Sequence, residues 1–302
     1  MTRHNMASAF VVATAGIAFF SAMDAVMKAL TIAIGAYNAM FWRVLAGAVI
    51  GGTVYFGLRC PWPTRAAMRV HVVRGVLSSF MGLLFFWGLA RVPLAQGVAL
   101  AFVAPLIALY LAAVLLGEKI ERRAIFGSLL GFAGVLVILS AQARADMGPD
   151  AFRGALAILA SAVLYAWNII LMRQQALVAK PLEVAFFTGL VVTSCYLVAA
   201  PFLAQVPPVE QLPAVLAAAV LGFGSLMLLS WAYARAEAQF LAPVEYTAFI
   251  WAVLLGIVFF AEPVRPLTAL GAAMIVAGCI IAARRRRAPV ADVEARVPGG
   301  AA

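Results

Sequence analysis

The chain has 302 residues, of which 66% are hydrophobic and only 11% are charged. A soluble globular domain is about half apolar and about a quarter charged, so a soluble fold of this length could not bury so much apolar surface. The net charge of +10 does not indicate nucleic-acid binding, because the Lys and Arg residues lie mostly in short segments between apolar runs.

A helix that crosses the hydrocarbon core of a bilayer needs about 20 mostly apolar residues. Ten runs fit this requirement: 7–30, 36–58, 70–90, 94–116, 123–141, 152–174, 182–203, 212–233, 240–261 and 267–283. The first run has no suitably placed cleavage motif and is expected to be a retained helix. Short connections such as 91–93 predict antiparallel neighbours. The sequence therefore predicts an all-α integral membrane protein with ten transmembrane helices.

The distribution of positive charge predicts the orientation of these helices. With a cytoplasmic N-terminus, the cytoplasmic segments hold sixteen Lys and Arg residues and the outer segments hold five. This asymmetry favours both termini in the cytoplasm. The tail 288–302 is rich in Ala, Pro and Gly, and we expect it to be disordered.

The two halves of the chain resemble each other at a separation of 144 residues, which aligns 87–139 with 231–283 without a gap. The informative matches are Trp87 with Trp231, Arg91 with Arg235, Glu118 with Glu262, Gly127 with Gly271, and Gly134 with Gly278. Each unit holds five helices, and because five is odd the second copy enters the membrane from the opposite side. The sequence thus predicts two inverted-topology repeats, 1–141 and 142–287, which is an arrangement typical of transporters.

Each unit has a Glu at the end of an apolar helix, followed by a helix that contains Gly. The segments Gly117-Glu118-Lys119 and Ala261-Glu262-Pro263 resemble the repeat of the EamA family, in the drug/metabolite transporter superfamily. The resemblance covers roughly residues 10–283. It implies a ten-helix carrier of small metabolites in a bacterial inner membrane.

A finer resemblance is to a bacterial branch that includes S-adenosylmethionine uptake carriers. It is carried by Ser21-x-x-Asp24-x-x-x-Lys28, Phe41-x-Arg43, Arg74-Gly75 and Ala242-Pro243-x-Glu245-Tyr246. This branch implies a cationic or zwitterionic solute.

Charged residues inside the apolar runs are candidate contacts, because charge in hydrocarbon is costly and faces a protein interior or a wet cavity. Asp24 and Lys28 are four residues apart and share a helix face, and Arg43 on the next run has a similar depth. These three residues are expected either to form an ion-pair network, with Lys28 reaching outward, or to include a substrate or proton contact. Glu118 and Glu262 are expected to have interfacial, helix-terminal roles.

Glu245 is the best single candidate for a substrate contact. It has no basic residue one helical turn away, and Pro243 weakens the helix just before it. Glu245 either reaches the cytoplasmic edge or is a cavity carboxylate that recognises a cation or a proton. The adjacent Tyr246 is a further candidate.

Aromatic and polar residues deep in the runs are candidates for solute contact. Tyr110 and Trp167 could stack on a planar or cationic solute, or could face lipid or packed helices. Asn168 is a polar contact or an interhelical hydrogen bond. Pro105 is expected to kink its helix. The histidines, including His71, are expected to be solvated at the cytoplasmic side.

Three functions compete, and a secondary transporter of a small polar metabolite fits best. The chain has no Walker A, H-E-x-x-H or G-x-S-x-G sequence, which argues against ATP-driven transport by this chain and against an enzyme. A membrane scaffold or regulatory protein is the alternative. We expect no metal, cofactor or disulfide, since Cys60, Cys195 and Cys279 have no ligand-like spacing. The expected partners are the metabolite and the lipid bilayer, and the sequence leaves a homodimer open.

Overall fold

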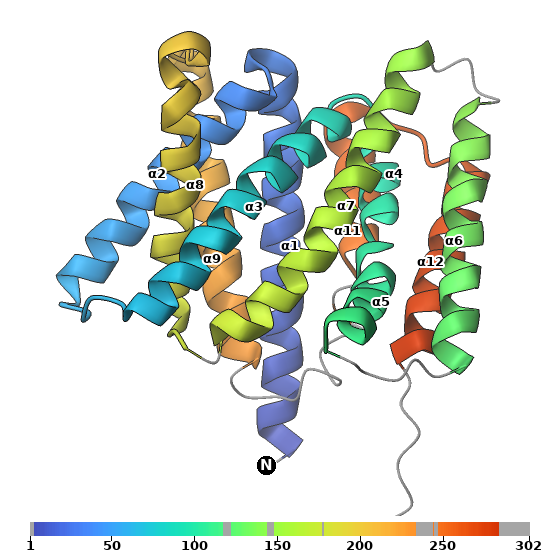
Figure 1. Cartoon of the computed structure of the whole chain (residues 1–302). Coiled ribbons are helices and arrows are strands. Elements are labelled where there is room, and N and C mark those ends of the chain that lie inside the picture. The colour runs from blue at the N-terminus through green and yellow to red at the C-terminus, as the bar shows by residue number, and fades with distance from the viewer. Residues whose placement is uncertain are drawn as a thin grey trace, which may run out of the picture.

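The computed structural model describes residues 3–116, 122–143, 148–176, 178–233, 244 and 247–283, and these described residues form a bundle of helices without any strand (Figure 1). The α-helices are α1 (Arg3–Ile34), α2 (Ala36–Gly57), α3 (Arg65–Leu89), α4 (Leu94–Ala101), α5 (Ala104–Leu116), α6 (Arg122–Ala143), α7 (Gly148–Ala176), α8 (Pro181–Leu203), α9 (Leu212–Tyr233), α11 (Thr247–Phe260) and α12 (Pro266–Ala283). A short 3₁₀ helix spans Val209–Gln211.

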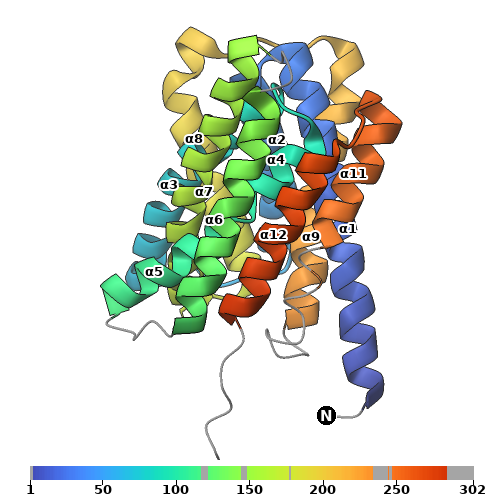
Figure 2. The same ribbon diagram turned by 90° about the vertical axis from the view of Figure 1, so that its right-hand side faces the viewer.

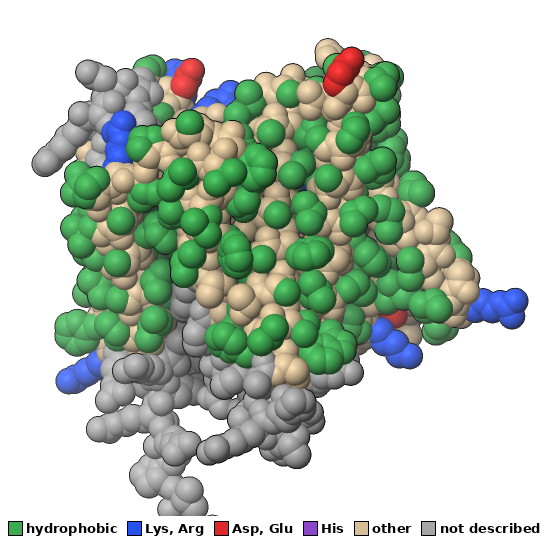
Figure 3. Space-filling model, turned by 180° about the vertical axis from the view of Figure 1, so that it is seen from behind, with side chains coloured by type: hydrophobic (Ala, Val, Ile, Leu, Met, Phe, Trp, Pro, Cys, Tyr) green, Lys and Arg blue, Asp and Glu red, His purple; other side chains and the backbone are tan. Residues whose placement is uncertain are grey.

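Six of these helices are long and apolar enough to cross a membrane, and four shorter apolar helices accompany them within the described part of the chain. The side of the bundle in Figure 3 is covered by hydrophobic side chains, with Lys, Arg, Asp and Glu gathered at its upper and lower margins. This distribution is that of a surface in contact with lipid. The first residues of α1 and the last residues of α12 lie at the same end of the bundle (Figure 1).

The first helix is longer than its apolar run, because it begins at Arg3 and ends only at Ile34. Gly35 then turns the chain into α2 with a φ of 81°, a conformation that glycine adopts without strain. Asp24 is therefore about 15 Å from the end of α1, at ~1.5 Å per residue, rather than near that end. This depth corresponds to the middle of a bilayer about 30 Å thick.

The run 94–116 is divided, since α4 ends at Ala101 and α5 begins at Ala104, immediately before Pro105. Pro105 has no N–H to donate to the preceding turn, so a break at this point is the expected consequence and the prediction of a kink is confirmed. The N–H of Leu106 donates to Val103 at 3.1 Å rather than to Phe102, and the carbonyl of Phe102 accepts a hydrogen bond of 3.3 Å from the thiol of Cys279 on α12.

Helices far apart in the sequence pack in pairs. The most extensive contacts join α6 with α12, α1 with α9, α3 with α7, and α2 with α8. Figures 1 and 2 both show α6 and α12 side by side at one edge of the bundle.

Glycines bring α6 and α12 into close contact. A Cβ added to Gly134 would lie 2.6 Å from the carbonyl oxygen of Gly271, and one added to Gly278 would lie 2.4 Å from that of Gly127. Both contacts are too short for any larger residue. Gly47 on α2 makes no such contact, because a Cβ added there would meet nothing within 4 Å.

Candidate functional site

One face of α1 is polar although it is buried. Ser21, Asp24, Lys28 and Thr31 follow one another at intervals of three or four residues and are each 3–6% exposed. This spacing places them in one line along the helix. The line faces the bundle interior, where α1 packs against α9, α11 and α2. Burying polar side chains inside a membrane protein is costly, because these side chains lose their contacts with water. A line of such side chains on a membrane helix therefore indicates a function.

Several polar atoms in this region are fully buried and have no hydrogen-bond partner. Among the described residues these atoms are Oδ1 of Asp24, Oγ1 of Thr31, Nε of Arg43 and Oγ of Ser225. They belong to α1, α2 and α9, which are in mutual contact. Since a buried unpaired polar group costs about 1–3 kcal/mol, four of them in one region indicate a site that polar ligand groups can satisfy.

The guanidinium of Arg43 extends from α2 across the bundle. Its two terminal nitrogens reach only sulfur atoms, with NH1 4.0 Å from Sδ of Met23 and NH2 3.8 Å from Sδ of Met40. On the side of α9, a Cβ at Gly222 would lie 3.5 Å from NH1 of Arg43, so the absence of a side chain there makes room for the guanidinium. Arg43 thus brings five N–H donors into the interior, where Nε has no partner and the terminal nitrogens contact only sulfur, a weak acceptor.

Asp24 and Arg43 interact electrostatically, but they do not form an ion pair. The two side chains are close enough for a coulombic interaction between their charges. Within the described residues, however, no hydrogen bond and no N–O contact of 4.0 Å or less joins them. Of the two alternatives that the sequence left open, the ion-pair network of Asp24, Lys28 and Arg43 is therefore wrong. The arrangement leaves an acidic and a basic group near each other without a direct contact. We call these two residues the Asp24/Arg43 site.

Lys28 is engaged elsewhere. Its ammonium group donates to a carboxylate oxygen of Glu262 and, at 2.7 Å, to the carbonyl oxygen of Val92. The second oxygen of Glu262 accepts from the N–H of Leu94 at 2.7 Å, at the start of α4. Since α1 continues for six residues beyond Lys28, this side chain is not at a helix end and is buried rather than directed outward. We call this arrangement the Lys28–Glu262 clasp.

A second polar cluster joins α3, α7 and α8. Nε of Arg74 donates to Oδ1 of Asn168 at 3.0 Å, and its NH1 donates to Oε1 of Gln175. The amide nitrogen of Gln175 is 2.6 Å from Nδ1 of His71, whose Nε2 is 3.1 Å from Oε1 of Glu183. His71 is completely buried, so the expectation that it is solvated is wrong.

The direction of these hydrogen bonds determines which ring nitrogen of His71 carries the proton. Arg74 can only donate, so Oε1 of Gln175 accepts and its amide nitrogen donates. Nδ1 of His71 must then be the acceptor, which leaves the ring proton on Nε2, facing the carboxylate of Glu183. The cluster is a fully directed chain of hydrogen bonds, and it serves to hold three helices together.

The remaining predicted residues are dispersed. Asn168 belongs to the α3–α7–α8 cluster, through its bond to Arg74. Trp167 is 48% exposed on the surface of α7, and Tyr110 is half-buried on α5. Glu245 and Tyr246 lie outside the described residues. Of the seven predicted site residues, the described structure brings Asp24 and Arg43 together.

Sequence reasoning missed two residues near Arg43. Tyr196 on α8 acts electrostatically on Arg43, and its hydroxyl donates to the carbonyl of Ser79 at 2.6 Å. Ser225 is one turn beyond Gly222 on α9. Nothing in the sequence distinguishes Ser225 from other serines in apolar helices, whereas the tyrosine hydroxyl deep in an apolar run was a usable signal.

Comparison with known proteins identifies the class. The sequence profile of the EamA-like transporter family matches residues 7–140 and again residues 152–284. The chain belongs to this family of membrane transporters.

Several relatives have names that describe transport. The chain is 26% identical to the pseudopaline exporter of Pseudomonas aeruginosa, over 89% of this chain and 93% of the relative. It is 28% identical to the aromatic amino acid exporter of Ancylobacter novellus, over 79% of this chain and 82% of the relative. It is 24% identical to the S-adenosylmethionine uptake transporter of Rickettsia bellii, over 85% of this chain and 86% of the relative. A solved crystal structure that is 25% identical matches with a TM-score of 0.60, covering 92% of this chain and 97% of that chain.

Proposed function

We propose that this protein is a secondary transporter of a small zwitterionic metabolite, and that the Asp24/Arg43 site binds it. The observation that carries this proposal is that a buried carboxylate and a half-buried guanidinium interact without a direct contact, and that Oδ1 of Asp24 and Nε of Arg43 are fully buried and have no hydrogen-bond partner. A stable structural ion pair would instead be hydrogen-bonded, because a buried charge without a partner destabilises the fold.

The chemistry of the site selects the solute. Arg43 offers planar N–H donors that suit a carboxylate, and Asp24 offers a carboxylate that suits an ammonium group. A solute with both groups, such as an amino acid or a derivative of one, satisfies both residues at once. Two relatives carry solutes of this type by name, an aromatic amino acid and S-adenosylmethionine.

Alternating access between two inverted five-helix repeats, 1–141 and 142–287, is the mechanism that we propose. The packing of the helices supports this mechanism. In the proposed correspondence, α1, α2, α3 and α6 of the first repeat match α7, α8, α9 and α12 of the second, in that order. Exchanging the repeats then turns the contact between α1 and α9 into the contact between α7 and α3, and leaves the contacts α6–α12 and α2–α8 unchanged. In this proposal α4 and α5 form one broken helix, which corresponds to the run that contains α11.

Individual residues support the same symmetry. A shift of 144 residues relates Gly134 to Gly278 and Gly127 to Gly271, and the contacts Gly134–Gly271 and Gly127–Gly278 exchange under this relation. This exchange is what a pseudo-two-fold axis between α6 and α12 produces.

The buried polar positions also follow the shift of 144 residues. It relates Asp24 to Asn168 and Thr31 to Gln175. If the repeats correspond in this way, Asn168 and Gln175 of α7 are the counterparts of Asp24 and Thr31 on α1. In the first repeat the line includes an unpaired acid, whereas in the second Asn168 and Gln175 are satisfied by Arg74. This difference supports a solute site at α1 and a structural role at α7.

The Lys28–Glu262 clasp supplies a closure for one end of the site. It joins α1 of the first repeat to the α11–α12 connection of the second, at the end of the bundle opposite the start of α1. With both termini in the cytoplasm, as the Lys and Arg distribution favours, this is the outer end. We propose that the clasp opens when the outer side of the transporter opens.

Solute counterflow in proteoliposomes tests the proposal. The purified full chain is reconstituted, loaded with an unlabelled zwitterionic amino acid and supplied with labelled solute outside. We expect saturable entry that zwitterions inhibit, and that analogues without the amine or without the carboxylate do not. The absence of saturable flux across a panel of amino acids and their derivatives would contradict the proposed solute class.

A further inference from the structure

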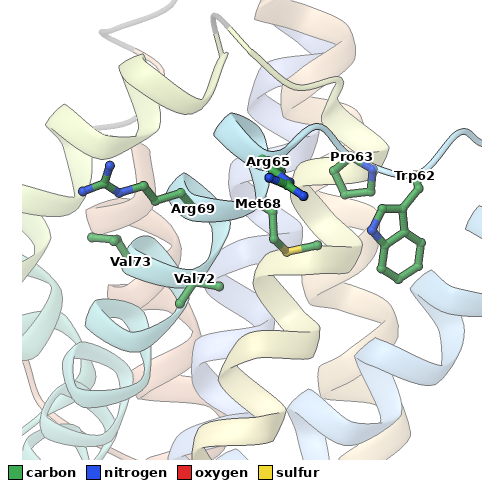
Figure 4. Close-up of a pocket in the computed structure, with 7 residues that line it drawn as sticks. All are labelled: Trp62, Pro63, Arg65, Met68, Arg69, Val72 and Val73. Carbon is green, nitrogen blue, oxygen red and sulfur yellow. The ribbon is translucent and has the colours of Figure 1, made fainter.

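A groove of about 550 Å³ lies on the surface, remote from the Asp24/Arg43 site, where the chain leaves the α2–α3 connection and enters α3. Its lining residues are Trp62, Pro63, Arg65, Met68, Arg69, Val72 and Val73. In Figure 4, Trp62 and Pro63 lie at one end of the groove, Arg65 and Met68 lie in the middle, and Arg69, Val72 and Val73 lie at the other end. We propose that this groove binds an anionic phospholipid.

The polar part of the groove is purely basic. Arg65 and Arg69 are four residues apart, so both side chains are attached on one face of α3, and neither Asp nor Glu lines the groove. Both arginines are exposed and have no ion-pair partner among the described residues. Two arginines one helical turn apart can both reach a phosphodiester, which accepts their N–H donors.

The groove continues into an apolar strip on the same face of α3. Val72, Val73, Val76 and Phe80 are 40–62% exposed. With 100° per residue, these four positions and the two arginines fall on one side of the helix, with the arginines at its start and the apolar side chains toward the membrane interior. A ligand that uses this whole face has a negatively charged head and a long apolar tail. A soluble phosphate compound would leave the strip unused.

The indole of Trp62 is placed where a headgroup meets its acyl chains. The ring is 68% exposed and packs edge-on against Phe187 of α8, at 5.2 Å between centroids. Tryptophan is enriched at this level of membrane proteins because its ring is apolar and its N–H is polar. The ring therefore forms a side wall that can contact the glycerol region of a lipid.

The connection that carries Trp62 is held in place. The hydroxyl of Tyr55 donates to the carbonyl of Pro61 at 2.6 Å, and Thr64 caps α3 by accepting from the N–H of Ala67 at 3.2 Å. Met68 packs on the cluster of Tyr55, Phe186 and Phe187 beneath the groove. A groove with fixed walls binds its ligand without first having to be ordered.

The lipid would lie on the outer face of the same turns whose inner face holds His71 and Arg74. We therefore expect bound lipid to stabilise the packing of α3 on α7 and α8. The starting end of α3 is at the same end of the bundle as the start of α1 (Figure 1), so the orientation proposed above places this lipid in the cytoplasmic leaflet, where anionic lipids attract basic segments.

The test uses the full chain in a zwitterionic detergent and measures lipid binding by native mass spectrometry and by thermal shift. The probes are phosphatidylglycerol, phosphatidylcholine and inorganic phosphate. We expect phosphatidylglycerol to bind and to raise the melting temperature, and the other two probes to have no effect. The Arg65→Gln/Arg69→Gln variant should bind phosphatidylglycerol roughly 30-fold more weakly. Arg122→Gln, which removes an exposed charge outside the groove, should bind it within about twofold of the wild type, since no direct contact is lost.

A separate variant tests the apolar half of the site. Phe80→Ser leaves both arginines in place and should weaken phosphatidylglycerol binding, because the acyl chain loses a contact. Equal phosphatidylglycerol binding by the double arginine variant and the wild type would overturn the proposal. Stabilisation by inorganic phosphate as strong as that by the lipid would assign the groove to a soluble anion instead and would also overturn it.

Discussion

We predict that substituting the two partners of the Lys28–Glu262 clasp lowers the stability of the protein by unequal amounts. The side chain of Lys28 is 4% exposed and that of Glu262 is 19% exposed. Glu262→Gln keeps an oxygen for the N–H of Leu94 but leaves the ammonium of Lys28 buried without a counter-charge. Lys28→Met leaves a carboxylate that is partly in water and still accepts from Leu94. Losing Glu262 should therefore cost more stability than losing Lys28.

The size of each loss in stability follows from the burial of the Lys28 and Glu262 side chains. Removing one partner of a buried ion pair costs about 3–5 kcal/mol, and the partial exposure of Glu262 places this pair at the lower end. With about 2–4 °C per kcal/mol, Glu262→Gln should lower the melting temperature in detergent by about 6–12 °C, and Lys28→Met by about half of that. The Lys28→Met/Glu262→Gln variant has no stranded charge and should melt above Glu262→Gln alone.

An exposed ion pair supplies the matched control. Asp150 and Arg153 form a pair at 3.3 Å whose side chains are 76% and 67% exposed, so Asp150→Asn should shift melting by no more than about 2 °C. Melting of all four variants is followed by intrinsic fluorescence in one detergent. If the double variant loses as much as the two single variants together, Lys28 and Glu262 are not coupled and the clasp is wrong.

Three further predictions concern other parts of the bundle. Gly134→Ala should lower stability by about 1–3 kcal/mol, because its Cβ would meet the carbonyl of Gly271, whereas Gly47→Ala should not destabilise the protein; chemical denaturation of both variants checks this. Gln175→Leu should cost about 2–4 kcal/mol by leaving two of its buried partners unsatisfied, and hydrogen exchange should rise in α3 and α7; unchanged exchange would refute the directed chain. Trp167→Ala should leave the transport rate within about twofold, since the ring lies on an exposed helix face; a loss of flux would place it in the site.

The helices could be predicted from the sequence because each depends on a local property. The apolar runs locate most helix bodies, and Pro105 marks the break in the run 94–116, since a missing N–H acts within one turn. The end of α1 was missed because the residues after Lys28 are as apolar as those before it, and Gly35 gave the only signal for the turn.

Which charges pair could not be predicted, since this depends on contacts between distant segments. Asp24 and Lys28 share a helix face, but Lys28 is bound by Glu262, which lies 234 residues later in the chain. His71 was expected in solvent because it is near a helix start, yet Gln175 and Glu183 from two other helices enclose it. The candidate site thus emerges only when tertiary contacts show which charged groups remain unpaired.

The most direct test of the central claim is counterflow of a zwitterionic solute by Asp24→Asn and Arg43→Gln, with melting temperatures measured on the same preparations. Because neither charged group is ion-paired within the described residues, both variants should melt within a few degrees of the wild type, while saturable flux falls at least tenfold. Asp150→Asn should transport at the wild-type rate. If both variants transport normally, or if they lose flux only because they no longer fold, the Asp24/Arg43 site does not bind the solute.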